Sequence, residues 1–252
     1  MFLKRLFGIL AIFTAGSLIY VGALASTVPV SSTTTQTTPT DDTHPSPQAL
    51  KFAINAYQWA LEHNQVKNPN VLTVVDFNLP SYDKRLWVIN LKNNEVIMHT
   101  YVAQGKNTGA IYATRFSNAP QSLESSPGIF TTGNEYMGEH GHSLRVNGLE
   151  AGINSNAYSR EIVIHPASYV TSAFVKANGY AGRSWGCFAV SPRLANSIIS
   201  KLKNGTVLFA DAPSEKSDSR VNHRLSAQGR VLYDGILHGG TENPVERFFE
   251  WL

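Results

Sequence analysis

Apolar residues at helical spacing mark the start of the folded part of the chain. They recur every three or four positions, at Leu50, Ile54, Tyr57 and Leu61. Ser46 is a suitable N-cap for such a helix, and Pro47 suits its first position because the proline lacks only an N–H that would have no helical partner. The pattern predicts a helix of about four turns with one face docked on a core.

Most of the following chain has the pattern of β-strands. Runs of β-branched and apolar residues, some of them flanked by turn residues, predict strands at 71–77, 86–90, 95–102, 162–164 and 206–209. Lys92-Asn93-Asn94 separates the second and third of these runs and predicts a hairpin. The run at 162–164 ends at His165. We therefore expect a mainly β fold of the α+β class with a few flanking helices.

Three other segments have weaker patterns. Residues 133–152 are rich in glycine and predict loops with one short strand at 144–149. Ser191-Pro192 predicts the start of another helix. The chain is polar from 211 to about 229, and residues 243–252 are compatible with one closing amphipathic helix.

The first 25 residues have the pattern of an export signal, and a linker follows them. Lys4 and Arg5 precede an uncharged apolar stretch, and Ala23-Leu24-Ala25 fits a signal-peptidase site. The stretch is also long enough to span a bilayer, so an uncleaved anchor stays open. Residues 26–47 are dominated by Ser, Thr and Pro, which predicts a flexible linker. The expected organisation is a signal peptide or membrane anchor (1–25), a linker (26–47), a folded domain (48–212) and a polar C-terminal extension (213–252), located in the periplasm or cell envelope.

Composition limits the function classes. The chain has 252 residues, of which 42% are hydrophobic and 15% charged, so a sizeable core is expected. Its formal net charge of +3 falls to +1 without Lys4 and Arg5. A nearly neutral chain without a basic cluster gives no reason to expect a nucleic-acid partner. The sequence does not determine the oligomeric state.

Cys187 is the only cysteine in the chain, so an internal disulfide is impossible. An unpaired thiol in an exported protein is a candidate for reactivity, and a thiol with a histidine can catalyse acyl transfer through a thioester. His165, at the end of a predicted strand, is the candidate base. Gly186 permits backbone angles that let N–H groups converge on an oxyanion. A lone cysteine is also often an inert buried residue, so composition alone leaves both interpretations open.

The spacing of these residues resembles a known signature. His165 followed by Ser184-Trp185-Gly186-Cys187 resembles the motif of the murein L,D-transpeptidase catalytic domain family, and the similarity covers roughly residues 50–212. Upstream segments that look like the branch with a longer insert include Ser126-Pro127-Gly128 and Gly141-His142-Ser143-Leu144-Arg145. The resemblance implies a mixed, mainly β, sandwich-like catalytic domain at 48–212 that acts on peptidoglycan stem peptides without a cofactor or a metal.

The resemblance also implies residue roles. Cys187 would attack the third residue of a tetrapeptide stem and expel D-alanine, and the thioester would pass to a stem amine, a protein lysine or water. His165 would act as base and then as acid, held by a backbone carbonyl rather than an acidic partner. Backbone N–H groups of Trp185, Gly186 and Cys187 would form the oxyanion hole, and Ser184 would hydrogen-bond the loop or His165.

The chain departs from the commonest family pattern near the nucleophile. Many members have His or Arg at the position of Trp185, and Arg or Asn at the position of Ala189. Arg183 or Arg145 could supply the missing charge, because arginine pairs well with carboxylates, although both could be ordinary surface residues. Tyr136 and His142 are further candidates to line the substrate groove.

Other functions remain open on sequence grounds. Water as the acceptor would make the protein an L,D-carboxypeptidase or a cysteine endopeptidase, and a buried Cys187 would indicate a non-catalytic cell-wall binding module. A metallohydrolase would need His140, His142 and His165 to converge, but no His-Glu-x-x-His or paired-cysteine spacing supports it.

Overall fold

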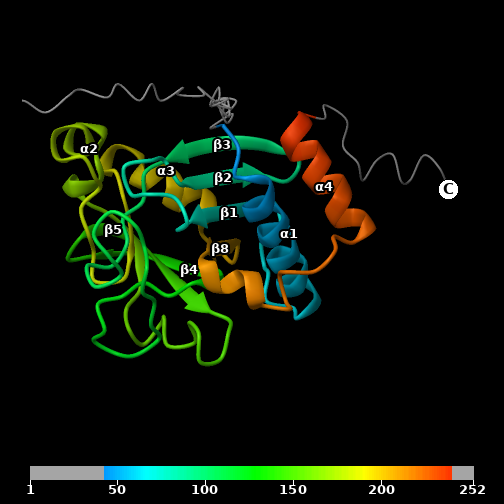
Figure 1. Cartoon of the computed structure of the whole chain (residues 1–252), viewed down its shortest axis with the longest axis horizontal. Coiled ribbons are helices and arrows are strands. Elements are labelled where there is room, and N and C mark those ends of the chain that lie inside the picture. Colours follow the sequence, from blue (N-terminus) through cyan, green and yellow to red (C-terminus); the bar gives the residue numbers. More distant parts are fainter. Residues whose placement is uncertain (1–42, 240–252) are drawn as a thin grey trace, which may run out of the picture. The chain divides into compact units, whose positions relative to one another are not determined.

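The computed structural model describes residues 43–239, and one eight-stranded mixed sheet organises this part of the chain (Figure 1). The strand order is β3-β2-β1-β8-β4-β5-β6-β7. The strands are β1 (Val71–Asp76), β2 (Leu86–Asn90), β3 (Glu95–Thr100), β4 (Gly128–Gly138), β5 (Gly141–Gly148), β6 (Val163–Pro166), β7 (Phe188–Val190) and β8 (Val207–Asp211). The helices are α1 (Pro47–Glu62), α2 (Ser172–Asn178), α3 (Pro192–Leu202) and α4 (Ala227–His238), with short 3-10 turns η1 (Ser168–Val170) and η2 (Pro213–Ser217). The prediction of a mainly β, α+β fold with flanking helices is confirmed.

Several predicted elements lie where the patterns placed them. The hairpin of β2 and β3 forms, and β6 carries His165. Helix α1 begins at Pro47, and the Oγ atom of Ser46 accepts a hydrogen bond from the Ala49 N–H at 3.2 Å. Helix α3 begins at Pro192, although Ser191 makes no side-chain capping bond. No helix within 43–239 combines the length and the apolar character needed to cross a membrane.

The two faces of the sheet pack against different helices. Side chains of one face, which we call the α3 face, form a core with α3 and include Val75, Leu208, Phe130, Leu144, Ile164 and Phe188. The opposite face, which we call the α1 face, packs against α1 through Val74, Phe209 and Ile129. Helix α1 contacts β1, β8 and β4. The α1 face therefore continues beyond α1 onto β5, β6 and β7.

The far end of the α1 face is covered by a different element. Ala189 of β7 packs with Val170 of η1 and Val175 of α2. In Figure 1, α1 and α2 accordingly lie toward opposite ends of the sheet. The stretch of sheet between the two helices is where the candidate site lies.

The structure corrects the prediction for residues 133–152. Instead of loops with one short strand, β4 and β5 form a long hairpin whose register shifts between Thr132 and Glu135. The distal part of β4 is mostly exposed on both sides, so it lacks the apolar alternation by which a strand is recognised. Gly141, at φ +85°, supplies the left-handed backbone that closes the turn.

The C-terminal extension also contains an element that the polar pattern concealed. Helix α4 starts within the stretch predicted to be polar, where the Ser226 Oγ atom accepts from the Gly229 N–H at 2.9 Å. It packs on α1, and a Cβ at Gly229 would lie 2.8 Å from Gln58 Oε1. Only Ile236 contributes a fully buried apolar side chain, which is too weak a signal to recognise in a sequence. The predictions for 1–25, for most of the linker and for a helix at 243–252 lie outside the described residues.

Candidate active site

The pairing of β6 with β7 places His165 and Cys187 on the same face of the sheet. These strands are parallel, with Ile164 opposite Phe188 and His165 opposite Ala189. Ile164 and Phe188 point to the α3 face. Because side chains alternate, His165 points to the α1 face. Cys187 immediately precedes β7, and extending the register by one residue places it on the same face beside Val163. Strand rise and spacing put the two Cα atoms roughly 8 Å apart, near enough for the side chains to approach each other.

A backbone carbonyl orients the imidazole of His165. Its side chain is buried, with 4% of the residue exposed, and its Nδ1 atom lies 3.0 Å from the Pro166 carbonyl oxygen. Because a carbonyl only accepts, Nδ1 carries the hydrogen and Nε2 is left to accept a proton. Burial lowers the pKa of His165, the bond to Pro166 opposes this, and the neighbouring His140 lowers the pKa further. The orienting group is thus a backbone carbonyl, as the resemblance implied.

Cys187 is a residue of intermediate exposure, and it belongs to none of the hydrophobic core clusters within residues 43–239. Its sulfur donates a hydrogen bond to the Glu161 carbonyl oxygen at 3.5 Å. Burial raises the pKa of the Cys187 thiol, while the Val163 N–H and the charge of Arg160 act in the opposite direction. The resting pair is therefore a thiol and a neutral imidazole. No hydrogen bond joins Cys187 to His165 within residues 43–239, because the Cys187 thiol is turned toward Glu161.

The turn before Cys187 requires glycine. Gly186 has φ +123°, and a Cβ there would lie 2.8 Å from the Glu124 carbonyl oxygen and 2.9 Å from Ile162 Cδ1. Ser184 closes this turn, since its Oγ donates to the Cys187 carbonyl at 2.7 Å and accepts from the Gly186 N–H at 3.1 Å. The predicted loop bond of Ser184 is present. The Gly186 N–H is thereby occupied, which leaves Trp185 and Cys187 as the candidate oxyanion donors.

A neighbouring segment fixes the loop from the other side. The Ser184 N–H donates to the Gln104 carbonyl at 2.9 Å, and the Lys106 N–H donates to the Ser184 carbonyl at 2.8 Å. Gln104 is itself held by Arg85, whose fully buried guanidinium donates to Gln104 Oε1 at 2.7 Å. Burial lowers the pKa of Arg85 to about 9. These contacts anchor the backbone around Cys187.

Two predicted substrate residues lie on the same face as the nucleophile. Arg145 pairs with Val163 across β5 and β6, so it lies in the same row as Cys187, about 10 Å away along the sheet. Its guanidinium is stacked between Tyr136 at 4.7 Å and Tyr158 at 5.3 Å from the ring centres. All three line a cavity of about 640 Å³.

The other predicted substrate residues lie elsewhere. His142 is on the α3 face, where Nδ1 lies 2.9 Å from Asn196 Oδ1 of α3 and Nε2 lies 3.0 Å from Glu135. The structure therefore does not bring His142 to the nucleophile, because it alternates with Arg145 along β5. Arg183 is exposed and donates to the Lys106 carbonyl at 3.2 Å. Trp185 is 72% exposed, with the Lys106 ammonium 6.0 Å above its ring.

The histidines do not form a metal centre. His140 stacks on His165, whereas His142 lies on the opposite face. Within residues 43–239, the one group of three potential ligands whose atoms converge is Glu150, Glu215 and Asp218, at another place in the fold.

A comparison with protein families identifies the domain. A family model described as "L,D-transpeptidase catalytic domain" matches residues 41–210. The chain belongs to this family. No curated protein matches the sequence.

Solved structures give distant similarities to the L,D-transpeptidase domain. An L,D-transpeptidase from Mycobacterium smegmatis is 19% identical with a TM-score of 0.35, and the match covers 57% of this chain and 59% of that protein. LD transpeptidase LdtMt1 in complex with imipenem is 16% identical with a TM-score of 0.35, over 56% of this chain and 59% of that one. The chain thus spans about three fifths of the length of each protein, and similarity this distant carries no argument about substrates.

One residue of the L,D-transpeptidase domain acquires a role only in the structure. The Arg160 guanidinium donates to two carbonyl and two hydroxyl oxygens between 2.6 and 3.0 Å, those of Ser117, Glu124, Ser122 and Ser126. It also lies 3.3 Å from the position of a Cβ at Gly186, and its charge interacts with Cys187. Arg160 therefore positions the loop behind Cys187. The sequence alone gives no sign of this role, because the partners of Arg160 are distant in the chain.

Proposed function

We propose that this protein is an exported peptidoglycan L,D-transpeptidase that works through a thioester on Cys187. Membership of the L,D-transpeptidase family supports an acyltransferase acting on peptidoglycan stem peptides. The observation that carries the residue assignment is the shared sheet face of Cys187 and His165, with the imidazole held as a neutral base. Export is proposed from the apolar leader at residues 1–25.

The acylation step follows from the resting protonation states. The Nε2 atom of His165 takes the proton of Cys187 as the sulfur attacks the carbonyl carbon of the third stem residue. The N–H groups of Trp185 and Cys187 stabilise the oxyanion that forms. The C–N bond to D-alanine then breaks, and His165 returns the proton to the leaving amine. A thioester and a free D-alanine result.

The deacylation step reverses these roles. An acceptor amine attacks the thioester carbon and loses a proton to His165, and the Cys187 thiol is restored when the C–S bond breaks. Attack by water gives a tripeptide, which would make the protein an L,D-carboxypeptidase. The accessibility of water to the thioester decides between the two acceptors.

Recognition of the acyl donor is proposed for the cavity lined by Tyr136, Arg145 and Tyr158, which opens on the same face of the sheet as Cys187. Stem peptides carry carboxylates, and a guanidinium can bind a carboxylate through two parallel hydrogen bonds. Tyr136 and Tyr158 orient Arg145 on the sheet face of Cys187. Arg145 is therefore the preferred carboxylate ligand, and the exposed Arg183 is the alternative.

Product analysis tests this function. Purified protein is incubated with tetrapeptide muropeptides, with and without an added acceptor amine, and the products are separated by mass. Release of D-alanine together with a new amide supports transpeptidation, whereas tripeptide alone supports the carboxypeptidase. Cys187→Ala should abolish both reactions. Unchanged turnover in Cys187→Ala, or activity lost to a chelator but not to thiol blockade, would rule out the thioester mechanism.

A further inference from the structure

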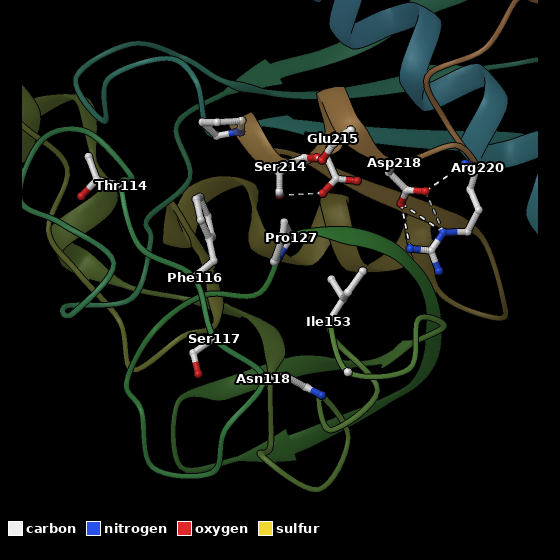
Figure 2. Close-up of a pocket in the computed structure, with 13 residues that line it drawn as sticks. Thr114, Phe116, Ser117, Asn118, Pro127, Ile153, Ser214, Glu215, Asp218 and Arg220 are labelled. Atoms are coloured by element: carbon white, nitrogen blue, oxygen red, sulfur yellow. Dashed lines mark hydrogen bonds and ion pairs between the residues drawn. The ribbon is translucent and has the colours of Figure 1, made fainter.

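Three carboxylates converge at a place that the proposed reaction does not use. Potential ligand atoms of Glu150, Glu215 and Asp218 all lie within 4.8 Å of one another. Glu150 and Glu215 are only 1% and 2% exposed. Glu215 and Asp218 line a cavity of about 660 Å³, shown in Figure 2. Such a concentration of buried negative charge requires compensation.

Glu150 is rigidly aimed at this point. Its Oε2 atom accepts from the Ile129 N–H and from Asn154 Nδ2, the latter at 3.1 Å. Gly128 has no side chain, and a Cβ there would collide with that carboxylate. The remaining oxygen, Oε1, is directed at the cluster, where it lies 3.0 Å from Arg220.

Glu215 provides the independent sign of a ligand. Its Oε1 atom accepts from the Ser214 hydroxyl at 3.0 Å, whereas Oε2 is buried and has no hydrogen-bond partner among residues 43–239. In Figure 2 the carboxylate lies between Ser214 and Asp218, with one oxygen turned toward each. A buried carboxylate oxygen without a partner is rare, because the loss of its hydration is not offset.

Arg220 neutralises only part of the cluster. Its Nε atom donates to both oxygens of Asp218, at 2.9 and 3.0 Å, and Nη2 reaches Glu150. One guanidinium therefore faces three carboxylates. The contacts of Arg220 just described involve Asp218 and Glu150 and do not include Glu215. Burial raises the pKa of Glu150 and of Glu215 to about 7. The Arg220 side chain is 30% exposed, so it has room to move outward.

We propose that Glu150, Glu215 and Asp218 form a Ca²⁺ site. Oxygen-only ligands suit a hard cation, and Ca²⁺ tolerates an irregular arrangement better than Mg²⁺, which demands near-ideal octahedral geometry. The absence of histidine and cysteine from the group disfavours zinc. Waters from the adjoining cavity complete the coordination. The ion bridges the end of β5, next to Glu150, and the segment after β8 that supplies Glu215 and Asp218, so it fastens the C-terminal extension to the sheet.

Thermal unfolding with the metal alone tests this proposal independently of any enzymatic activity. Purified protein is stripped with EDTA, dialysed and titrated with CaCl₂, with MgCl₂ as the comparison. At a concentration of Ca²⁺ about one hundred times Kd, the Tm should rise by roughly 5–10 °C, with a smaller effect of Mg²⁺. An unchanged Tm at millimolar Ca²⁺, together with no heat of binding by calorimetry, would overturn the proposal.

Three variants assign the effect to the cluster. Glu215→Gln should abolish the Ca²⁺-dependent rise in Tm and still fold, because it removes a buried unpaired charge. Arg220→Ala should lower the metal-free Tm but strengthen Ca²⁺ binding, since a competing cation is removed. Glu62→Gln, at an exposed position of α1, should behave like the unaltered protein. Retention of the full Ca²⁺ effect in Glu215→Gln would contradict the site, even if Ca²⁺ binds elsewhere.

Discussion

The imidazole of His140 stacks on the imidazole of His165, with ring centres 4.5 Å apart and planes inclined by 28°. His140 lies in the turn between β4 and β5, so the long hairpin reaches back over the proposed base. A positive charge on His140 would oppose protonation of His165, and this contact is one cause of the lowered pKa of His165. The hairpin thus helps to keep the base neutral.

Replacement of His140 should therefore move the acid limb of the pH profile. His140→Phe keeps a ring over His165 but removes the charge, so the pKa of His165 should rise and the acid limb of kcat/KM should shift to higher pH. His142→Gln is the control, because His142 lies on the opposite face and its loss should leave the limb in place. Identical profiles for His140→Phe and the unaltered protein would contradict the role of the stack.

The unaltered protein should show a neutral thiol–imidazole pair. Because the pKa of His165 is lowered, its imidazole stays unprotonated to below the ordinary value of 6.5, and the acid limb of kcat/KM should lie below that pH. Because the pKa of Cys187 is raised, the rate of alkylation by iodoacetamide should reach its midpoint above pH 9.0. An alkylation midpoint well below pH 9.0 would indicate a preformed thiolate instead.

Arg160 should affect both the geometry of the loop around Cys187 and the pKa of the Cys187 thiol. Arg160→Lys and Arg160→Gln each lose the multiple hydrogen bonds to the 117–126 loop, so turnover should fall by about 10- to 100-fold. Only Arg160→Gln removes the charge, and it should raise the pKa of Cys187 more than Arg160→Lys does, as measured by the alkylation profile. Arg193→Gln, on the exposed side of α3, is the control. Equal alkylation profiles in the two Arg160 variants would leave Arg160 a purely structural role.

Gly186→Ala should disrupt the nucleophile loop. The added Cβ meets the Glu124 carbonyl oxygen and Ile162, and the positive φ adds strain of about 1–3 kcal/mol. We expect turnover to fall at least 100-fold with a lower Tm. Gly152→Ala is a matched control, since Gly152 also has a positive φ (+78°) but no atom within 4 Å of its Cβ position. Full activity in Gly186→Ala would contradict the requirement for glycine in the turn before Cys187.

Local pattern predicted much of the fold. The strand that delivers His165, the β2–β3 hairpin and the start of α1 follow from periodicity and capping residues within a few positions of one another. The β4–β5 hairpin and α4 were missed because their exposed polar positions hide the pattern, and their stability comes from contacts with distant segments.

The candidate site was also predictable only in part. The motif around Cys187 and the histidine at the end of β6 could be recognised from residue types alone. Residue types alone could not show which face of β5 a residue occupies. Arg145 and His142 were therefore both predicted to contact substrate, although they point to opposite faces. The roles of Arg160 and His140 depend on tertiary contacts, which the spacing of residues in the sequence does not reveal.

Intact-mass spectrometry of the protein mixed with tetrapeptide muropeptides tests the thioester most directly. We expect a transient adduct equal to the muropeptide without its terminal D-alanine, located on residue 187 by peptide mapping and lost in Cys187→Ala. Turnover without such an adduct under rapid acid quenching, or an adduct on another residue, would contradict the thioester mechanism.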